Sequence, residues 1–195
     1  MSSETEGDSR IIRLHEAFSG ESDRAAAIVA GALLDEAVLR LLDRRLAPAP
    51  HKDRSITGGA NAPLGAFSTR IDACCQLGLI SKHLAADLHL IRRVRNDFAH
   101  STDDLSFDSG PIRDRVRALE VTSGFNKRYP AVREAIGPAG SRNDFLGIAA
   151  WILYELECQV NEVVPLVPRN PEFGYVDWSS LPDDVLTMLK NSIDE

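Results

Sequence analysis

Cysteine is scarce in this chain of 195 residues. The three cysteines are Cys74, Cys75 and Cys158, two of them adjacent, and no C-x-x-C pair occurs. An odd count without paired spacing argues against a disulfide framework and against a cysteine-based zinc site. We therefore expect a cytoplasmic protein in which the three thiols are small core residues.

Long apolar runs and an excess of basic charge are also missing. The most apolar run, residues 145–154, is too short to cross a bilayer, and the polar, acidic start MSSETEGDSR is unlike a signal peptide. With 22 Lys and Arg against 29 Asp and Glu, the formal net charge is −7. This balance disfavours a broad basic face for duplex DNA. We therefore expect no membrane segment and no direct sequence-specific DNA binding.

The motifs of common enzymes and cofactor sites are absent as well. The sequence contains no P-loop, no G-x-G-x-x-G, no G-x-S-x-G and no H-E-x-x-H. Its five histidines are scattered, and none is spaced with a cysteine or another histidine as a metal pair would be. The sequence therefore predicts neither a metal nor a cofactor.

Apolar residues at helical spacing are abundant, whereas no alternating pattern long enough for a strand occurs. Ser22 and Ser81 stand where helix caps are expected, and SRND at 141–144 matches the pattern of Ser followed three residues later by an acid. The fold class predicted is all-α, a single-domain multi-helix bundle with two long antiparallel core helices. The expected helices cover residues 22–46, 64–78, 81–99, 111–121, 144–164 and 182–191.

The distribution of Pro, Gly and charge divides the chain into three parts. Residues 1–21 are expected to be a flexible segment, residues 22–165 the helical bundle, and residues 166–195 a Pro-rich strap and a C-terminal helix that pack on the bundle. Within the bundle, residues 47–63 are rich in Pro and Gly and predict a flexible loop. The stretches GFNKRYP and GPAG predict two shorter loops.

The stretch IRRVRNDFAHS, residues 91–101, places an arginine in an apolar row. Leu84, Leu88, Ile91, Arg95 and Phe98 are spaced 4, 3, 4 and 3 residues apart, so they share one stripe of a helix. A guanidinium keeps its charge, and a position in the core therefore demands an acceptor.

Two interpretations of Arg95 stay open. In one, Arg95 supports the structure by binding Asp35, Glu36 or the carbonyl end of a neighbouring helix. In the other, the helix faces a cleft or the seam of a dimer, where Arg95 binds an anion.

His100 lies about 140° round an ideal helix from Arg95, so the two share a site only if the last turn unwinds. A histidine is also favoured at a helix C-terminus by the helix dipole alone. Asn96 precedes His100 by four residues and is expected to share a hydrogen bond with it. Arg92 adds positive charge, which suits either a solvated face or a phosphate site.

Three blocks of the sequence resemble the mannitol operon repressor family. They are GALLDEAVLRLL, LGAFSTRIDACCQLGLIS and IRRVRNDFAHSTDDLSF, within about residues 30–107, in the order and spacing of that family. Its members are all-α transcriptional regulators without a recognised DNA-binding motif. The resemblance implies a regulator that acts through protein–protein interaction, as a homodimer with a protein partner. The loop 47–63 and the tail 166–195 have no counterpart that we can place.

The pattern Arg95-Asn96-x-x-x-His100 is similar to the R-x4-6-H motif of HEPN-domain proteins. These are helical bundles, commonly dimers, and many are metal-independent ribonucleases. The similarity implies that His100 would act on the ribose 2′-OH as general base and that Arg95 would stabilise charge on the scissile phosphate. The alternative function is therefore a HEPN-like endoribonuclease, or a descendant that still binds RNA. A third alternative is an assembly module in which Arg95 is only a buried ion pair.

Overall fold

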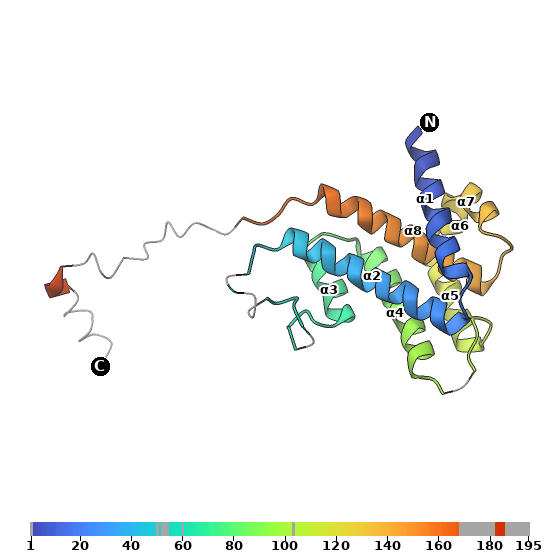
Figure 1. Cartoon of the computed structure of the whole chain (residues 1–195), viewed down its shortest axis with the longest axis horizontal. Coiled ribbons are helices and arrows are strands. Elements are labelled where there is room, and N and C mark those ends of the chain that lie inside the picture. The colour runs from blue at the N-terminus through green and yellow to red at the C-terminus, as the bar shows by residue number, and fades with distance from the viewer. Residues whose placement is uncertain are drawn as a thin grey trace.

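The computed structural model describes residues 2–49, 51, 55–59, 61–102, 104–167 and 182–185, and in these residues it is helical without strands. The expected all-α bundle is confirmed. Figure 1 shows the helices gathered around one long axis, along which α2 and α8 lie side by side. No helix in the described part is long and apolar enough to cross a membrane.

The two longest helices, α2 (Asp23–Arg45) and α8 (Ser141–Glu162), form the centre of the bundle. Arg142 at the start of α8 pairs with Asp23 at the start of α2. At the other end, Arg45 donates a hydrogen bond of 2.7 Å to the carbonyl of Val164, just beyond α8. The two helices therefore start side by side and end side by side, so α2 and α8 run parallel.

The long helix that runs antiparallel to α2 is α4 (Lys82–His100). Arg24 at the start of α2 donates to the carbonyl of Ser101 at the end of α4, over 3.0 Å. The prediction that the two long core helices run antiparallel is therefore wrong for α2 and α8, and the long helix antiparallel to α2 is α4. The two longest helices are joined by long connections instead, and these allow a parallel arrangement.

Residues 1–21 are not the flexible segment that the sequence predicted. They contain α1 (Ser2–Ser19), which packs along α8 with Ile11 and Phe18 buried. His15 lies between these two residues in the same row and is only 4% exposed. The spacing of four and three residues is that of one helix face, so the bundle begins within α1.

The remaining helices complete the bundle at its two ends. Helix α3 (Phe67–Gln76) packs on α2 and α4, and α5 (Gly110–Ser123) packs on α4 and α8. The stretch GFNKRYP is not a loop, because α6 (Phe125–Arg128) lies within it and α7 (Pro130–Ala135) begins at its last residue.

The end of α5 and the start of α8 differ from the sequence prediction, and one residue accounts for each difference. Gly124 adopts φ +62°, which ends α5 and lets α6 begin at the next residue. Ser141 does not cap α8 as predicted, because the N-cap position is Gly140 and Ser141 is already helical.

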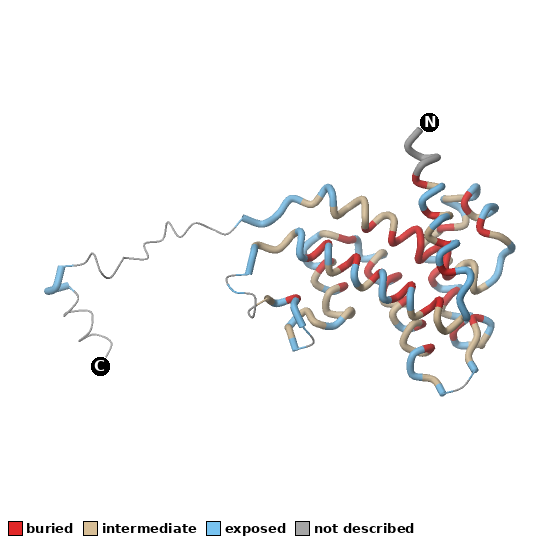
Figure 2. Tube along the Cα trace, viewed as in Figure 1, coloured by how far each residue is buried: buried red, intermediate tan, exposed pale blue. Residues whose placement is uncertain are grey.

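The core lies where α2, α4 and α8 meet, as the buried positions in Figure 2 show. Leu34, Val38 and Leu41 of α2 are at most 1% exposed. Phe107 stacks between Phe98 of α4 and Phe145 of α8, with ring centroids 5.0 Å apart in each pair. Burial of this apolar surface is the main stabilising contribution, and it holds α4 in place.

The loop predicted over 47–63 is anchored where the structure describes it. Thr57 is buried and donates a hydrogen bond of 2.7 Å to Asp43 near the end of α2. The strap predicted from residue 166 lies beside α2 at its first residue, since the N–H of Leu166 donates to the carbonyl of Arg45 over 2.7 Å. Most of the predicted strap and C-terminal helix lies outside the described residues.

Candidate functional site

Helix α4 carries most of the residues that the sequence singled out. Ser81 caps it, because its side chain accepts a hydrogen bond from the N–H of Leu84 over 3.1 Å. The helix then continues without a break to His100, and its last turn is closed by Ser101, whose N–H donates to the carbonyl of Asp97. The last turn therefore does not unwind.

Arg95 packs its aliphatic stem against Gly31 of α2. A Cβ atom built on Gly31 would lie 2.7 Å from Cγ and 3.0 Å from Cβ of Arg95, so only a glycine permits this contact. The guanidinium reaches sideways, where Nη1 donates to Oδ1 of Asn96 over 3.0 Å. Arg95 is half-buried, with its stem in the bundle and its charge at the edge.

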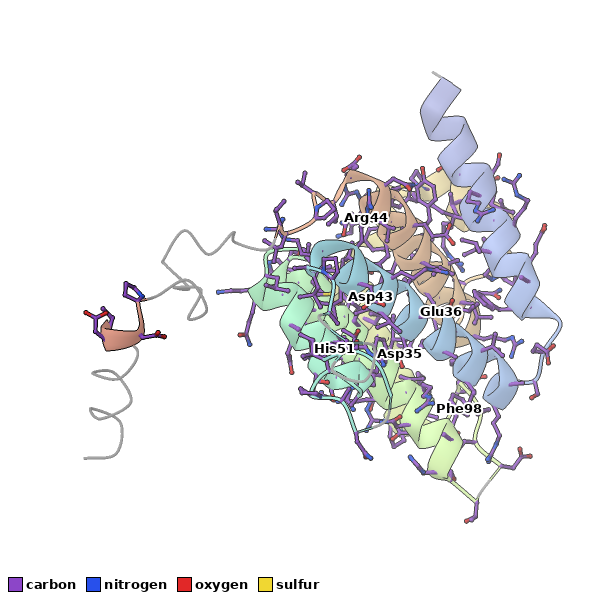
Figure 3. The ribbon with its side chains drawn as sticks, turned by 60° about the vertical axis from the view of Figure 1, so that its left-hand side comes forward. Asp35, Glu36, Asp43, Arg44, His51 and Phe98 are labelled. Carbon is purple, nitrogen blue, oxygen red and sulfur yellow. The ribbon has the colours of Figure 1, made fainter. Side chains whose placement is uncertain are left out.

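The carboxylates expected to bind Arg95 are engaged elsewhere. Asp35 accepts a hydrogen bond of 2.7 Å from Arg70 of α3, and Glu36 pairs with Arg40 on α2 itself over 3.3 Å. Figure 3 shows Asp35 and Glu36 on α2, with Phe98 near the end of α4. In the described part of the chain Arg95 forms no ion pair.

Arg92, about one turn before Arg95 on α4, adds a second half-buried cation. Because it precedes Arg95 by three residues, the two lie on adjoining parts of the helix surface. Its Nε atom is buried and has no hydrogen-bond partner among the residues described. In the described ranges no carboxylate pairs with either arginine.

His100 opens onto a different part of the surface. It is exposed and lines a groove of about 490 Å³ together with Asn96, Asp97 and Arg115. Arg115 of α5 pairs with Asp97 across this groove. No hydrogen bond joins Asn96 to His100 in the described residues, and Oδ1 of Asn96 accepts from Arg95 instead.

A single chain therefore does not bring Arg95 and His100 to one point. The regular helix keeps them about 140° apart round its axis, and Arg95 is not among the residues that line the groove. Asn96 alone touches both places, since it binds Arg95 and also lines the groove.

A polar cluster that sequence reasoning missed lies at the other end of α4. Asp87 is 3% exposed and accepts a hydrogen bond from the hydroxyl of Thr122 on α5. Burial raises the pKa of Asp87 above its ordinary value, because a charged carboxylate is poorly solvated there. A signal existed, since Asp87 precedes the apolar Ile91 by four residues and so falls in the buried row.

Tyr129 and Trp151 continue this cluster toward α8. The Nε1–H of Trp151 donates to Glu155 over 3.0 Å, and the Tyr129 hydroxyl donates to the same carboxylate oxygen over 3.3 Å. Burial, and then the nearby Glu155 charge, raise the pKa of Tyr129. Arg128 lies over both rings, 5.9 Å from the centroid of Tyr129 and 6.0 Å from that of Trp151.

The structure groups no three His, Cys, Asp or Glu side chains as metal ligands within the described ranges. Cys74 is buried against the carbonyl of Val38, and burial raises the pKa of its thiol to about 12, so it is an unreactive core residue. Neither Cys75 nor Cys158 is paired with it.

The structure is thus an all-α bundle in which Arg95 lies at the crossing of α2 and α4. Neither a protein-family model nor a curated protein matches the sequence. Among solved structures, the chain is similar to one described as the X-ray structure of the MtlR–HPr complex from Escherichia coli. The TM-score is 0.55 and the identity 18%, over 79% of this chain and 98% of the other. At this identity the likeness concerns the fold.

Proposed function

We propose that this chain is a cytoplasmic transcriptional regulator that acts by binding a protein partner rather than DNA. Three observations support the proposal. The fold is like that of MtlR, whose solved structure is a complex with the protein HPr. The net charge of −7 disfavours duplex DNA as the ligand. The third observation, Arg95 at the crossing of α2 and α4, indicates where the partner would bind.

Helix α2 also carries an exposed apolar surface, which comes near Gly31 at Ile28, whereas Val29 and Leu33 lie about 160° round the helix from that glycine. We call this surface the α2 face and define it by Ile28, Val29, Ala32 and Leu33. Val29 is 42% and Leu33 37% exposed, which is high for large apolar residues of a central helix. Ile28 precedes Gly31 by three residues and so lies beside the glycine on which Arg95 packs.

The single observation that carries the proposal is the state of Arg95. Its stem is held by Gly31 and its guanidinium by Asn96, and among the described residues no carboxylate neutralises it. An arginine that is already ordered loses little entropy on binding, and arginines at the edge of an apolar patch are frequent centres of protein interfaces. The partner surface that fits is an apolar patch with an acidic group beside it.

The test measures binding of HPr by calorimetry. We expect the wild type to bind and Arg95→Ala to bind at least about tenfold more weakly, which corresponds to about 1.4 kcal/mol. Arg93→Ala is the matched control, because Arg93 is an exposed arginine of the same helix, two residues earlier. Equal binding by the wild type and Arg95→Ala would contradict this placement, and no binding by the wild type would exclude an HPr-type partner.

A HEPN-like endoribonuclease is the second candidate, and the exposed His100 at its groove with Asn96 is the observation that favours it. It requires two protomers, so that Arg95 of one reaches the groove of the other. Incubation of the chain with mixed cellular RNA and EDTA tests it, with the Arg95→Ala/His100→Ala variant as control. The regulator proposal predicts no cleavage by either protein. Cleavage by the wild type alone, leaving cyclic phosphate ends, would establish the ribonuclease instead.

A further inference from the structure

A cavity of about 380 Å³ opens between the start of α4, the end of α5, α6 and α8. It is separate from the crossing of α2 and α4 and from the groove at His100, with which it shares no lining residue. Its volume suits a small organic molecule. The side chains that decide its chemistry are Asp87, Thr122, Arg128, Trp151, Glu155 and Gln159.

The cavity is rich in hydrogen-bond acceptors that its own donors leave unsaturated. Asp87 receives one hydrogen bond from Thr122, whereas two carboxylate oxygens have room for about four. Oε1 of Gln159 is buried and has no partner among the residues described. Glu155 accepts from Trp151 and Tyr129 through Oε1 alone, so its second oxygen adds a further acceptor.

The indole and guanidinium donors of the cavity are already used or lie at its rim. The indole N–H of Trp151 is bonded to Glu155 and to the Tyr129 oxygen, the latter over 3.1 Å. Arg128 is exposed and lies over the two aromatic rings rather than beside Asp87. A ligand that supplies donors would therefore satisfy these acceptors, and a buried acceptor left without one is costly.

The apolar walls limit what else the ligand can be. Trp151 is 9% and Ile152 0% exposed, so together they form an apolar floor behind the acceptors. Around the cavity two carboxylates, Asp87 and Glu155, face the guanidinium of Arg128 and the imidazole of His83. The two carboxylates favour a positive charge inside the cavity. A primary ammonium carries three donors and one positive charge on an alkyl stem, and it matches both the acceptors and the floor.

We propose that this cavity binds a small aliphatic molecule through a primary ammonium group. The ammonium donates to Asp87, Gln159 and Glu155, and the carbon chain lies against Trp151 and Ile152. Two sources share this chemistry. A diamine would leave its second ammonium at the rim, whereas an amino acid would place its carboxylate beside Arg128.

Trp151 allows the binding to be measured directly by fluorescence. The chain has two tryptophans, so the full-length Trp178→Phe variant leaves Trp151 as the reporter. This protein is titrated with putrescine, with 4-aminobutyrate and with 1,4-butanediol at constant ionic strength. We expect a saturable change with at least one amine and none with the diol, which has the same chain length but no ammonium.

Two further variants, made in the Trp178→Phe protein, assign the site. Asp87→Asn keeps the shape and the bond from Thr122 but removes the charge, and we expect it to weaken amine binding at least about tenfold. Asp114→Asn, an exposed carboxylate of α5 outside the cavity, is the matched control and is expected to bind normally. If 4-aminobutyrate binds more tightly than putrescine, Arg128→Ala should abolish the difference.

The proposal would be overturned by any of three results. These are no saturable response to either amine, an equal response to butanediol, or undiminished binding by an Asp87→Asn protein whose melting curve shows it to be folded. None of them bears on HPr binding at the α2 face, so the two proposals fail independently.

Discussion

At the scale of single residues, Gly31 and Arg95 set how closely α2 and α4 approach. A methyl group on Gly31 would meet Cγ of Arg95 at 2.7 Å, near the base of that side chain rather than at its flexible end. We expect Gly31→Ala to destabilise the protein by about 1–3 kcal/mol through overpacking, which outweighs a gain of about 1 kcal/mol in helix propensity. Urea unfolding measures this difference.

A double-mutant cycle separates the clash from other effects. Arg95→Ala alone should change stability by less than about 1 kcal/mol, because it removes a half-buried side chain without breaking an ion pair; a buried pair would lose about 3–5 kcal/mol. In the double variant the clash is gone, so Gly31→Ala should become neutral or stabilising. Additive effects in the cycle would show that the contact with Arg95 is not the reason why position 31 requires a glycine.

The buried Asp87 gives a second prediction at this scale. Burial raises the pKa of Asp87 in the folded state above the ordinary value of 3.8. Between the pKa of the unfolded state and that of the folded state, the folded state therefore binds more protons than the unfolded state. The contribution of Asp87 to stability therefore falls as the pH rises through this window. We expect Asp87→Asn to be at least as stable as the wild type at pH 7. Its melting temperature should lose that advantage toward pH 3.8, and a less stable variant at pH 7 would contradict the argument.

At the scale of elements, the docking of α1 depends on a buried neutral histidine. Nδ1 of His15 lies 3.2 Å from the hydroxyl of Ser19, and its Nε2 is buried without a partner in the described residues. Burial lowers the pKa of His15, with a smaller effect in the same direction from Arg133 and Arg142. The nearby side chain of Asn143 and the charge of Glu16 act in the opposite direction.

The sign of the pH effect follows from this lowered pKa. As the pH falls below 6.5, the unfolded chain binds the proton first, so stability decreases and the loss is complete below the folded-state pKa. We expect the melting temperature to fall between about pH 7.5 and pH 5.5, and to fall less in His15→Gln, which cannot take up that proton. His51→Gln, in the loop after α2, is the control. Identical pH profiles for wild type and His15→Gln would refute the prediction.

At the scale of the whole molecule, the homodimer expected from the sequence stays a prediction. Light scattering on the eluting protein decides it, because one chain has a mass of 21.4 kDa and a dimer has about twice this mass. A mass of one chain at every concentration would exclude the homodimer, and with it the two-protomer arrangement that a ribonuclease site requires.

The sequence by itself determined that the fold is all-α and where most of the helices lie. The expected helix 22–46 is found at Asp23–Arg45, and Ser81 caps α4 as predicted. These features were readable because capping and helical spacing are local properties of the chain. The sequence did not predict helix α1. Ile11 and Phe18 have the spacing of one helix face, but the first ten residues are polar and indicated a flexible segment.

What only the tertiary structure decided is which side chains meet. The sequence placed Arg95, Asp35 and Glu36 correctly on helices, yet Asp35 binds Arg70 of α3, and Arg95 packs on a glycine. The cavity around Asp87 likewise draws residues from α4, α5, α6 and α8. Partners of this kind depend on where helices cross and in which direction they run. The period of 3.6 residues predicts which residues share one face of a helix, but not which other helix packs against that face.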